Sequence, residues 1–156
     1  MVFRCAVVVL ASLAATPAAA VDYRWVVGTG QGSVEASIRN KAGGNFIVFC
    51  GSGTDERRSG IILEGIADTA SKGKPLDVQV VIDGKSFPFS VTDGYGPVAA
   101  RGDRLMLQNL AQALSASRLA EFTIEYPSLD KSERYSLLSV RDALKEKKGT
   151  IVTPCL

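Results

Sequence analysis

The sequence contains no histidine and only three cysteines among its 156 residues. Histidine is the commonest general base near neutral pH and the commonest zinc ligand, so its absence argues against His-dependent catalysis and His-ligated metal sites. An excess of one charge is also missing, because 18 Lys and Arg residues are balanced by 16 Asp and Glu residues. This balance argues against an electrostatic nucleic-acid binder. We therefore expect no cofactor, no metal and no nucleic-acid partner.

The one long apolar stretch lies at the N-terminus and has the pattern of a secretory signal peptide. Arg4 supplies a positive charge, and Cys5–Leu13 forms a short apolar run that is interrupted by one serine. Small residues at Ala18 and Ala20 fit the cleavage rule, which makes Val21 the first residue after processing. An N-terminal membrane anchor is the alternative, but this run is too short to span a bilayer.

Removal of the signal peptide defines the expected domain and its compartment. We predict that residues 1–20 are cleaved and that residues 21–156 form one exported domain, which is periplasmic or secreted. These 136 residues carry 17 basic and 16 acidic side chains, so they remain close to neutral. They contain no apolar run of about 18 residues, and we expect no membrane span after cleavage.

Cleavage would remove Cys5 and leave two cysteines, Cys50 and Cys155. Exported proteins lie in oxidising compartments, where a single pair of cysteines allows one intramolecular disulfide. That bond would close a loop of about 106 residues and tie the C-terminal tail to a central strand. Two unpaired thiols are the alternative. Two cysteines without histidine cannot complete a tetrahedral zinc site.

Strand patterns dominate the first two thirds of the exported domain. Alternating polar and apolar residues predict half-buried strands, whereas the continuous apolar run Phe46–Cys50 predicts a central strand. Asp83-Gly84 separates two strand-like segments and favours a two-residue hairpin turn, because both positions require positive φ. Pro88 in the second of these segments indicates an edge strand or a bulge. The predicted strands are 23–27, 34–38, 46–50, 60–66, 78–82, 85–91, 122–126 and 135–138.

Two segments have helical rather than alternating periodicity. Apolar residues recur at helical spacing between Leu107 and Leu114, and Asp103 is placed to act as the N-cap. A shorter helix is predicted over 140–147. Strands therefore precede helices instead of alternating with them, which is typical of a β-rich α+β fold. We expect a mostly antiparallel, sandwich-like sheet with one or two peripheral helices.

Two short motifs suggest functions that the rest of the pattern does not support. Gly28, Gly30 and Gly32 have the wrong spacing for a dinucleotide-binding loop and precede a strand, so we interpret them as a turn. Arg101-Gly102-Asp103 is an integrin-type tripeptide, but Asp103 is required by the helix cap. Trp25, the single tryptophan, is expected to pack in or beside the core.

A catalytic site is poorly supported by the sequence. Carboxylate pairs could be assembled from several acidic residues, but no spacing selects one pair. No Ser-x-x-Lys motif opens a predicted helix, and Gly-x-Ser-x-Gly is absent. We therefore predict that the protein is not an enzyme and that it has no catalytic residue. The acidic residues considered are Glu35, Asp55, Glu56, Glu64 and Asp83.

The order of these features resembles a known class of exported proteins. The resemblance rests on four features. They are an early Trp25-Val26 strand, the strand Phe46–Cys50 that ends in cysteine, the hairpin Val78–Gly84 and an amphipathic segment that leads from Ala143 to Cys155. It is to small periplasmic β-sandwich proteins typified by type VI secretion accessory proteins, and more loosely to the invasion-associated locus B family. The resemblance implies a non-catalytic envelope protein with no functional residue to transfer.

Two functions from different classes remain open at this point. The first is a non-catalytic exported envelope protein that acts as a binding or accessory module, linked to a secretion system, with another envelope or secreted protein as its partner. The second is an inhibitor or immunity protein that inserts a loop into the cleft of a cell-wall hydrolase.

Overall fold

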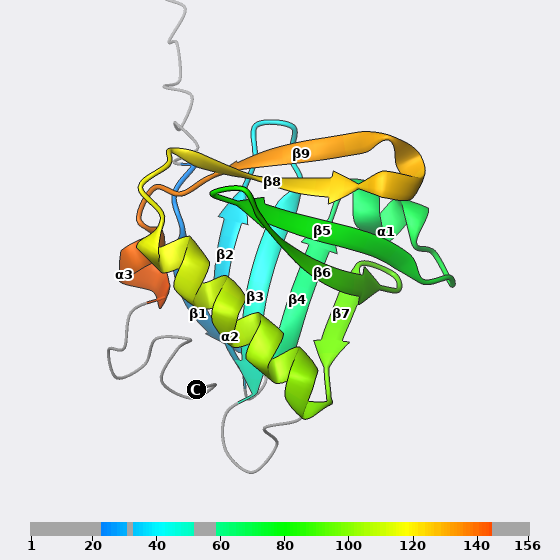
Figure 1. Ribbon diagram of the computed structural model, residues 1–156, viewed down its shortest axis with the longest axis horizontal. Helices are drawn as coiled ribbons and strands as arrows, with labels where there is room; N and C mark the ends of the chain where they lie inside the picture. Colours follow the sequence, from blue (N-terminus) through cyan, green and yellow to red (C-terminus); the bar gives the residue numbers. More distant parts are fainter. Residues whose placement is uncertain (1–22, 31–32, 52–58, 145–156) are drawn as a thin grey trace, which may run out of the picture.

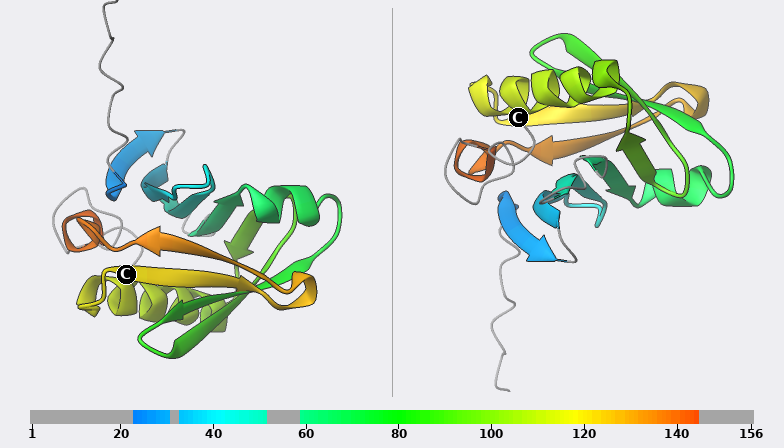
Figure 2. Two further views of the ribbon diagram at one scale, coloured as in Figure 1. Left: turned by 90° about the horizontal axis from the view of Figure 1, so that it is seen from above. Right: turned by 90° about the horizontal axis from the view of Figure 1, so that it is seen from below.

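The computed structural model describes residues 23–30, 33–51 and 59–144. These residues form two antiparallel sheets that pack face to face and enclose one hydrophobic core, with their strands running in different directions (Figures 1 and 2). The predicted β-rich, sandwich-like α+β fold is therefore confirmed. The signal-peptide prediction, with cleavage between Ala20 and Val21, lies outside the described residues.

The first sheet has five strands in the order β1-β2-β3-β4-β7. The continuous apolar run occupies the middle strand, as predicted, because side chains on both faces of that strand are buried. The strands are β1 (Val26–Gly30), β2 (Ser33–Arg39), β3 (Asn45–Gly51), β4 (Ser59–Glu64) and β7 (Tyr95–Val98).

The second sheet has four strands in the order β6-β5-β8-β9, and each strand alternates between buried and exposed residues. The predicted hairpin is confirmed, since Asp83 and Gly84 have φ values of 49° and 74°. Pro88 lies on the edge strand β6, also as predicted. The strands are β5 (Leu76–Ile82), β6 (Lys85–Val91), β8 (Glu121–Tyr126) and β9 (Lys131–Ser136).

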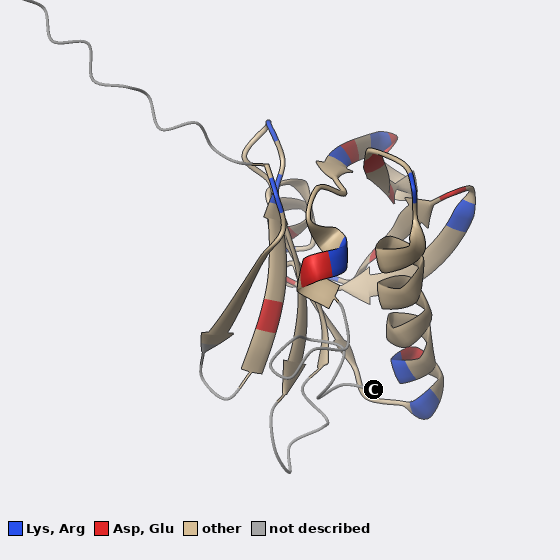
Figure 3. Cartoon of the chain, turned by 90° about the vertical axis from the view of Figure 1, so that its left-hand side faces the viewer, with Lys and Arg blue, Asp and Glu red and all other residues tan. Residues whose placement is uncertain are grey.

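Three helices lie around the sheets: α1 (Ile66–Ala70), α2 (Arg101–Ala116) and α3 (Val140–Leu144). The amphipathic helix α2 contacts β4, β5, β7 and α3, and it closes the core with one apolar face. Its charged residues lie at its N-terminal end (Figure 3). The buried residues of that face are Leu107, Leu110, Ala111 and Leu114.

Four sequence-based assignments are wrong in detail. The first strand, predicted over 23–27, is β1 and begins only at Val26. A turn was predicted over Gly28–Gly32, but Gly28 and Gly30 belong to strand β1. Helix α2 begins at Arg101, so Ala100 occupies the N-cap and Asp103 lies in the first turn. At that position its carboxylate still interacts favourably with the helix dipole. The final predicted strand is shifted toward the N-terminus, because β9 begins at Lys131.

Two elements were not predicted at all. Helix α1 follows β4 directly, and the edge strand β7 follows a tight turn at Asp93 and Gly94, whose φ values are 50° and 73°. The sequence around β7 contains two glycines and a proline, a composition that is depleted in strands.

Trp25 fixes the start of β1 to the second sheet, and its expected place in the core is confirmed. Its side chain is 3% exposed and packs edge-on against Phe46, with ring centroids 5.9 Å apart. Its indole Nε1–H donates to the carbonyl oxygen of Ser136 at 2.9 Å, and its backbone N–H donates to that of Leu138 at 3.0 Å. The beginning of β1 is thus held by both main-chain and side-chain bonds.

Candidate functional site

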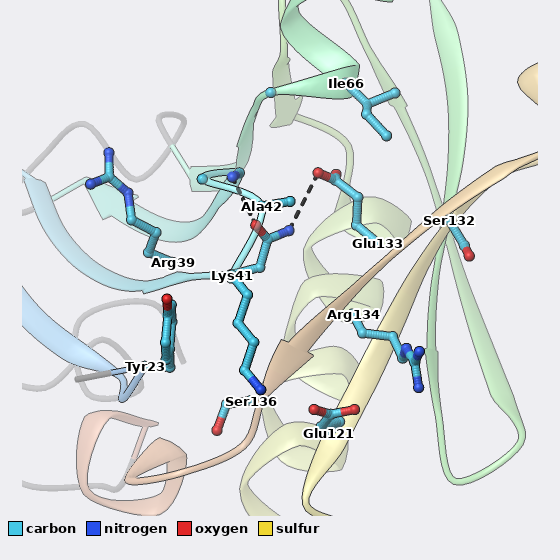
Figure 4. A pocket seen from close by; sticks show the side chains of 14 residues that line it. Tyr23, Arg39, Lys41, Ala42, Ile66, Glu121, Ser132, Glu133, Arg134 and Ser136 are labelled. Carbon is cyan, nitrogen blue, oxygen red and sulfur yellow. Dashed lines mark hydrogen bonds between the residues drawn. The ribbon is translucent and has the colours of Figure 1, made fainter. Parts of the chain in front are cut away.

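A cleft of about 750 Å³ opens between the turn that joins β2 to β3 and the strand β9 (Figure 4). Its floor contains Glu133, a carboxylate that is only 8% exposed. Its rim is polar and carries charges of both signs. The charged and hydroxyl-bearing rim residues are Tyr23, Arg39, Lys41, Glu121, Ser132, Arg134 and Ser136.

Glu133 accepts hydrogen bonds from three side chains on different segments. The hydroxyls of Tyr126 and Tyr135 both donate to Oε2, the latter at 3.2 Å, and Asn40 Nδ2 donates to Oε1 at 3.4 Å. Asn40 also accepts, through Oδ1, from the backbone N–H of Gly44 at 2.8 Å. The network therefore joins the β2–β3 turn to β8 and β9.

Both tyrosine hydroxyls remain protonated donors in this network. Burial raises the pKa of Tyr126 and of Tyr135 above the ordinary value of 10, and the neighbouring Glu133 carboxylate raises both further. A phenol that stays neutral can keep donating to the carboxylate over the whole physiological pH range. These bonds compensate the cost of burying the Glu133 side chain.

Gly44 is required by the close packing of the turn on this network. A Cβ atom at Gly44 would lie 2.6 Å from Glu133 Oε1 and 3.0 Å from the hydroxyl of Tyr135. The three hydrogen bonds to Glu133 all come from side chains of this protein's own turn and strands. We therefore interpret Glu133 as a structural residue that holds these segments together. In Figure 4 the Lys41 side chain extends from the turn toward Ser136, away from Glu133.

The outer face of the five-stranded sheet has a different character. Strand register places Val26, Ser37, Ile47, Ile62 and Tyr95 opposite one another in a single row across all five strands. Ile47 is 9% exposed and Tyr95 is 41% exposed. The row is therefore apolar at four of its five positions and reaches solvent at both ends.

The adjacent row on the same face adds an aromatic pair. Phe49 lies opposite Gly60, which lies opposite Pro97 on β7. The ring of Phe49 stacks on that of Tyr95, with centroids 5.4 Å apart and planes 22° apart. We call Val26, Ile47, Phe49, Ile62, Tyr95 and Pro97 the outer patch.

No described helix or strand lies over the outer patch as a further layer, but the centre of the patch is shielded by its neighbours, since Phe49 is 5% exposed and Ile47 is 9% exposed. The five-stranded sheet forms one side of the molecule, whereas α2 and the second sheet lie on its other face (Figures 2 and 3). Ile47 and Phe49 are also separate from the main core cluster, which contains the inward-facing residues of both sheets. The outer patch is consequently a second apolar cluster, on the surface side of the sheet.

The outer face of the second sheet provides an internal comparison. Its outward positions carry mainly polar and charged residues, as expected for a face in contact with water. Strands of the five-stranded sheet carry only three charged residues, which are Glu35, Arg39 and Glu64. The outward residues of β5 and β8 are Asp77, Gln79, Val81, Glu121, Thr123 and Glu125.

The residues singled out from the sequence are dispersed in the structure. Cys50 is fully buried at the end of β3, while Cys155 lies outside the described residues, so their pairing stays a prediction. Of the acidic candidates, Glu35, Glu64 and Asp83 occupy separate elements. Asp55 and Glu56 lie outside the described ranges. Arg101, Gly102 and Asp103 form the exposed first turn of α2.

Sequence reasoning missed Glu133 and the outer patch. Glu133 could have been found from the spacing of Glu133 and Tyr135, which places both on the inner face of one strand. The outer patch could not be found in this way, because it depends on the register of five strands. Across residues 23–30, 33–51 and 59–144, no group of three or more His, Cys, Asp or Glu side chains could hold a metal ion.

None of the helices in the described ranges has the length and apolar character that a bilayer-spanning helix requires. No curated protein and no solved structure matches this chain. The sequence model of the YfjT family matches residues 23–144, which include every helix and strand described above. The chain therefore belongs to the YfjT family.

Proposed function

We propose that this protein is a non-catalytic, exported binding or accessory module that docks a partner protein on the outer patch. The observation that carries the proposal is the apolar row across the five-stranded sheet, which ends in Tyr95. The row is exposed at its two ends, where Val26 is 54% and Tyr95 is 41% exposed, and exposed apolar residues that group on a folded domain are characteristic of interaction surfaces. Tyrosine is enriched among the residues that dominate binding energy, because it combines a large apolar area with a polar hydroxyl.

The signal-peptide pattern supports an envelope or secreted partner, since both proteins would then meet outside the cytoplasm. The resemblance to type VI secretion accessory proteins supports a secretion-system component as that partner. Intact-mass spectrometry of protein recovered from periplasm tests the compartment. A mature chain beginning at Val21 is expected, and a chain that retains Met1 would contradict export.

A capture experiment with matched surface variants tests the binding function. Mature protein would be used to recover partners from periplasmic extract, and the affinity of the recovered protein would then be measured for Tyr95→Lys. We expect at least a tenfold loss, because the lysine replaces an exposed aromatic ring at the end of the row. Val81→Lys is the control, since Val81 is an apolar outward residue of the other sheet.

The identity of the recovered partner separates the two functional classes. A secretion-machine component supports the accessory module, whereas a muramidase or amidase would favour a hydrolase inhibitor. The described hairpins offer short turns such as Asp83-Gly84, which are poorly suited to filling an enzyme cleft. Equal binding by the wild type and by Tyr95→Lys would contradict docking on the outer patch.

A further inference from the structure

The four edge strands of the two sheets differ in how they are protected against further pairing. Natural edge strands are usually very short or contain proline or charged residues, and these features prevent another strand from pairing with them. Strand β7 has four residues with Pro97, and β6 contains Pro88 and Lys85. Strand β9 carries Lys131, Glu133 and Arg134.

Strand β1 has none of these protective features. Its sequence, Val-Val-Gly-Thr-Gly, contains neither a charge nor a proline. Val26 and Val27 are 54% and 42% exposed, and Gly28 and Thr29 are exposed as well. Both faces of the strand are thus accessible, while its start is fixed to the core through Trp25.

No strand within the described ranges pairs with the outer side of β1, and the main-chain groups on that side can be assigned from one observed bond. The backbone N–H of Trp25 donates to Leu138 instead of to β2, so residue 25 directs its N–H away from the β1–β2 ladder. Main-chain groups alternate in direction along a strand. Val27 and Thr29 therefore direct their N–H and C=O groups toward the open edge, whereas Val26 and Gly28 face β2.

We propose that the open edge of β1 pairs with β1 of a second copy of this chain, antiparallel and around a two-fold axis at Gly28. In this register Val27 lies opposite the partner's Thr29, and Thr29 lies opposite the partner's Val27. Each of these pairs exchanges main-chain hydrogen bonds through groups that are directed outward. The register does not use Trp25, whose N–H is already bonded to Leu138.

Three features favour a second copy over an unrelated strand. The pattern is self-complementary, since a two-fold axis at Gly28 brings the outward groups of one strand opposite those of the other. No charge on β1 opposes a like charge across the axis. The formal net charge of the whole chain is only +2, so repulsion between copies is weak. Pairing would join two five-stranded sheets into one continuous sheet with two outer patches.

The closing experiment uses sedimentation equilibrium of the mature protein over a range of concentrations. Wild type is expected to form a reversible dimer. Thr29→Pro should weaken dimerisation at least tenfold, because proline removes an edge-facing N–H without breaking the β1–β2 ladder. Thr29→Val is the matched control, since it keeps the N–H and the branched side chain, and it should dimerise like the wild type.

A charge exchange at the two-fold axis gives a second, independent readout. A Cβ atom at Gly28 would meet nothing within 4 Å, so larger side chains fit there. Gly28→Lys and Gly28→Glu should each be monomeric, because like charges would face one another, and an equimolar mixture should form heterodimers. A wild type that stays monomeric at every concentration, a dimer unaffected by Thr29→Pro, or a mixture that fails to associate would each overturn the proposal.

Discussion

At the residue scale, the structure separates turn residues that sequence chemistry identifies from contacts that only tertiary packing creates. Asp83-Gly84 was predictable, because a two-residue hairpin requires positive φ at both positions and Asp-Gly accommodates this. Gly44 and Glu133 were not, because the reason for each lies in a residue far away in the sequence. A local sequence pattern cannot predict that the Glu133 carboxylate accepts a hydrogen bond from Asn40, 93 residues earlier in the chain.

Replacement of Gly84 by valine tests the turn directly. Gly84→Val should lower the free energy of unfolding by at least about 1 kcal/mol, because a β-branched residue is strained at a φ of 74°. The midpoint of urea denaturation measures the change. Gly102→Val is the control, since a Cβ atom at Gly102 would meet nothing within 4 Å and this exposed residue has no positive φ, and its midpoint should fall little or not at all. Equal midpoints for Gly84→Val and wild type would refute the strain.

The buried tyrosines predict a loss of stability in alkaline solution. The pKa values of Tyr126 and Tyr135 are raised in the folded state, first by burial and then by Glu133. Above about pH 10 the unfolded chain releases these protons while the folded chain retains them, so unfolding becomes more favourable as pH rises. Each tyrosine contributes a slope of up to about 1.4 kcal/mol per pH unit.

Urea denaturation between pH 8 and pH 11 measures this slope. Tyr135→Phe should reduce it by about half, because one of the two titrating groups is removed. Tyr95→Phe serves as the control, since Tyr95 is exposed on the outer patch and makes no bond to Glu133. An identical pH dependence in wild type and Tyr135→Phe would contradict this account of the network.

At the element scale, strands with a strong pattern were predictable and strands with a weak one were not. The continuous apolar run became the central strand β3 because it must be buried on both faces. Strand β7 was missed because Gly96 and Pro97 are poor strand formers. Gly96 is explained by close packing, because a Cβ atom there would lie 2.9 Å from Val91 Cγ1 and 3.1 Å from Ile61 Cγ1. The approach of β4 to β7 is close as well and leaves no room for a Cβ atom at Gly60.

Substitution of Gly60 tests this close approach. A Cβ atom at Gly60 would lie 2.2 Å from the backbone oxygen of Gly96, so Gly60→Ala must displace β7 from β4. We expect a destabilisation of about 1–3 kcal/mol from the overpacked contact. The near-ultraviolet signal of the Tyr95–Phe49 pair should change as well. Gly102→Ala, at an exposed position where a Cβ atom would meet nothing within 4 Å, should neither lower the stability nor change this signal.

At the scale of the whole molecule, the outer faces of the two sheets differ in composition. Their inner faces share one core, which binary patterning predicted, whereas their outer faces diverge into a polar face and an apolar patch. The apolar patch could not be predicted from the sequence, because its residues come from separate strands. Those in the row are Val26, Ile47, Ile62 and Tyr95. Only the register between strands brings them into one row.

The remaining prediction concerns the covalent link between the sheet and the end of the chain. Cys50 is fully buried at the end of β3, within hydrogen-bonding reach of Ser59 Oγ at 3.7 Å. A Cys50–Cys155 disulfide would close a loop of about 106 residues, which is worth up to about 4–5 kcal/mol in the chain-entropy model. Reduction should therefore lower the urea midpoint and leave the two-sheet core folded.

Single and double replacements separate this bond from ordinary packing effects. Cys155→Ala should reproduce the effect of reduction, and the Cys50→Ala, Cys155→Ala double variant should be no less stable than Cys50→Ala alone. The two substitutions remove one shared bond, so their effects cannot add. Cys50→Ala alone should cost slightly more than Cys155→Ala, because it also empties part of a buried site. Peptide mapping without reductant measures the pairing itself, and two free thiols in protein purified from periplasm would exclude it.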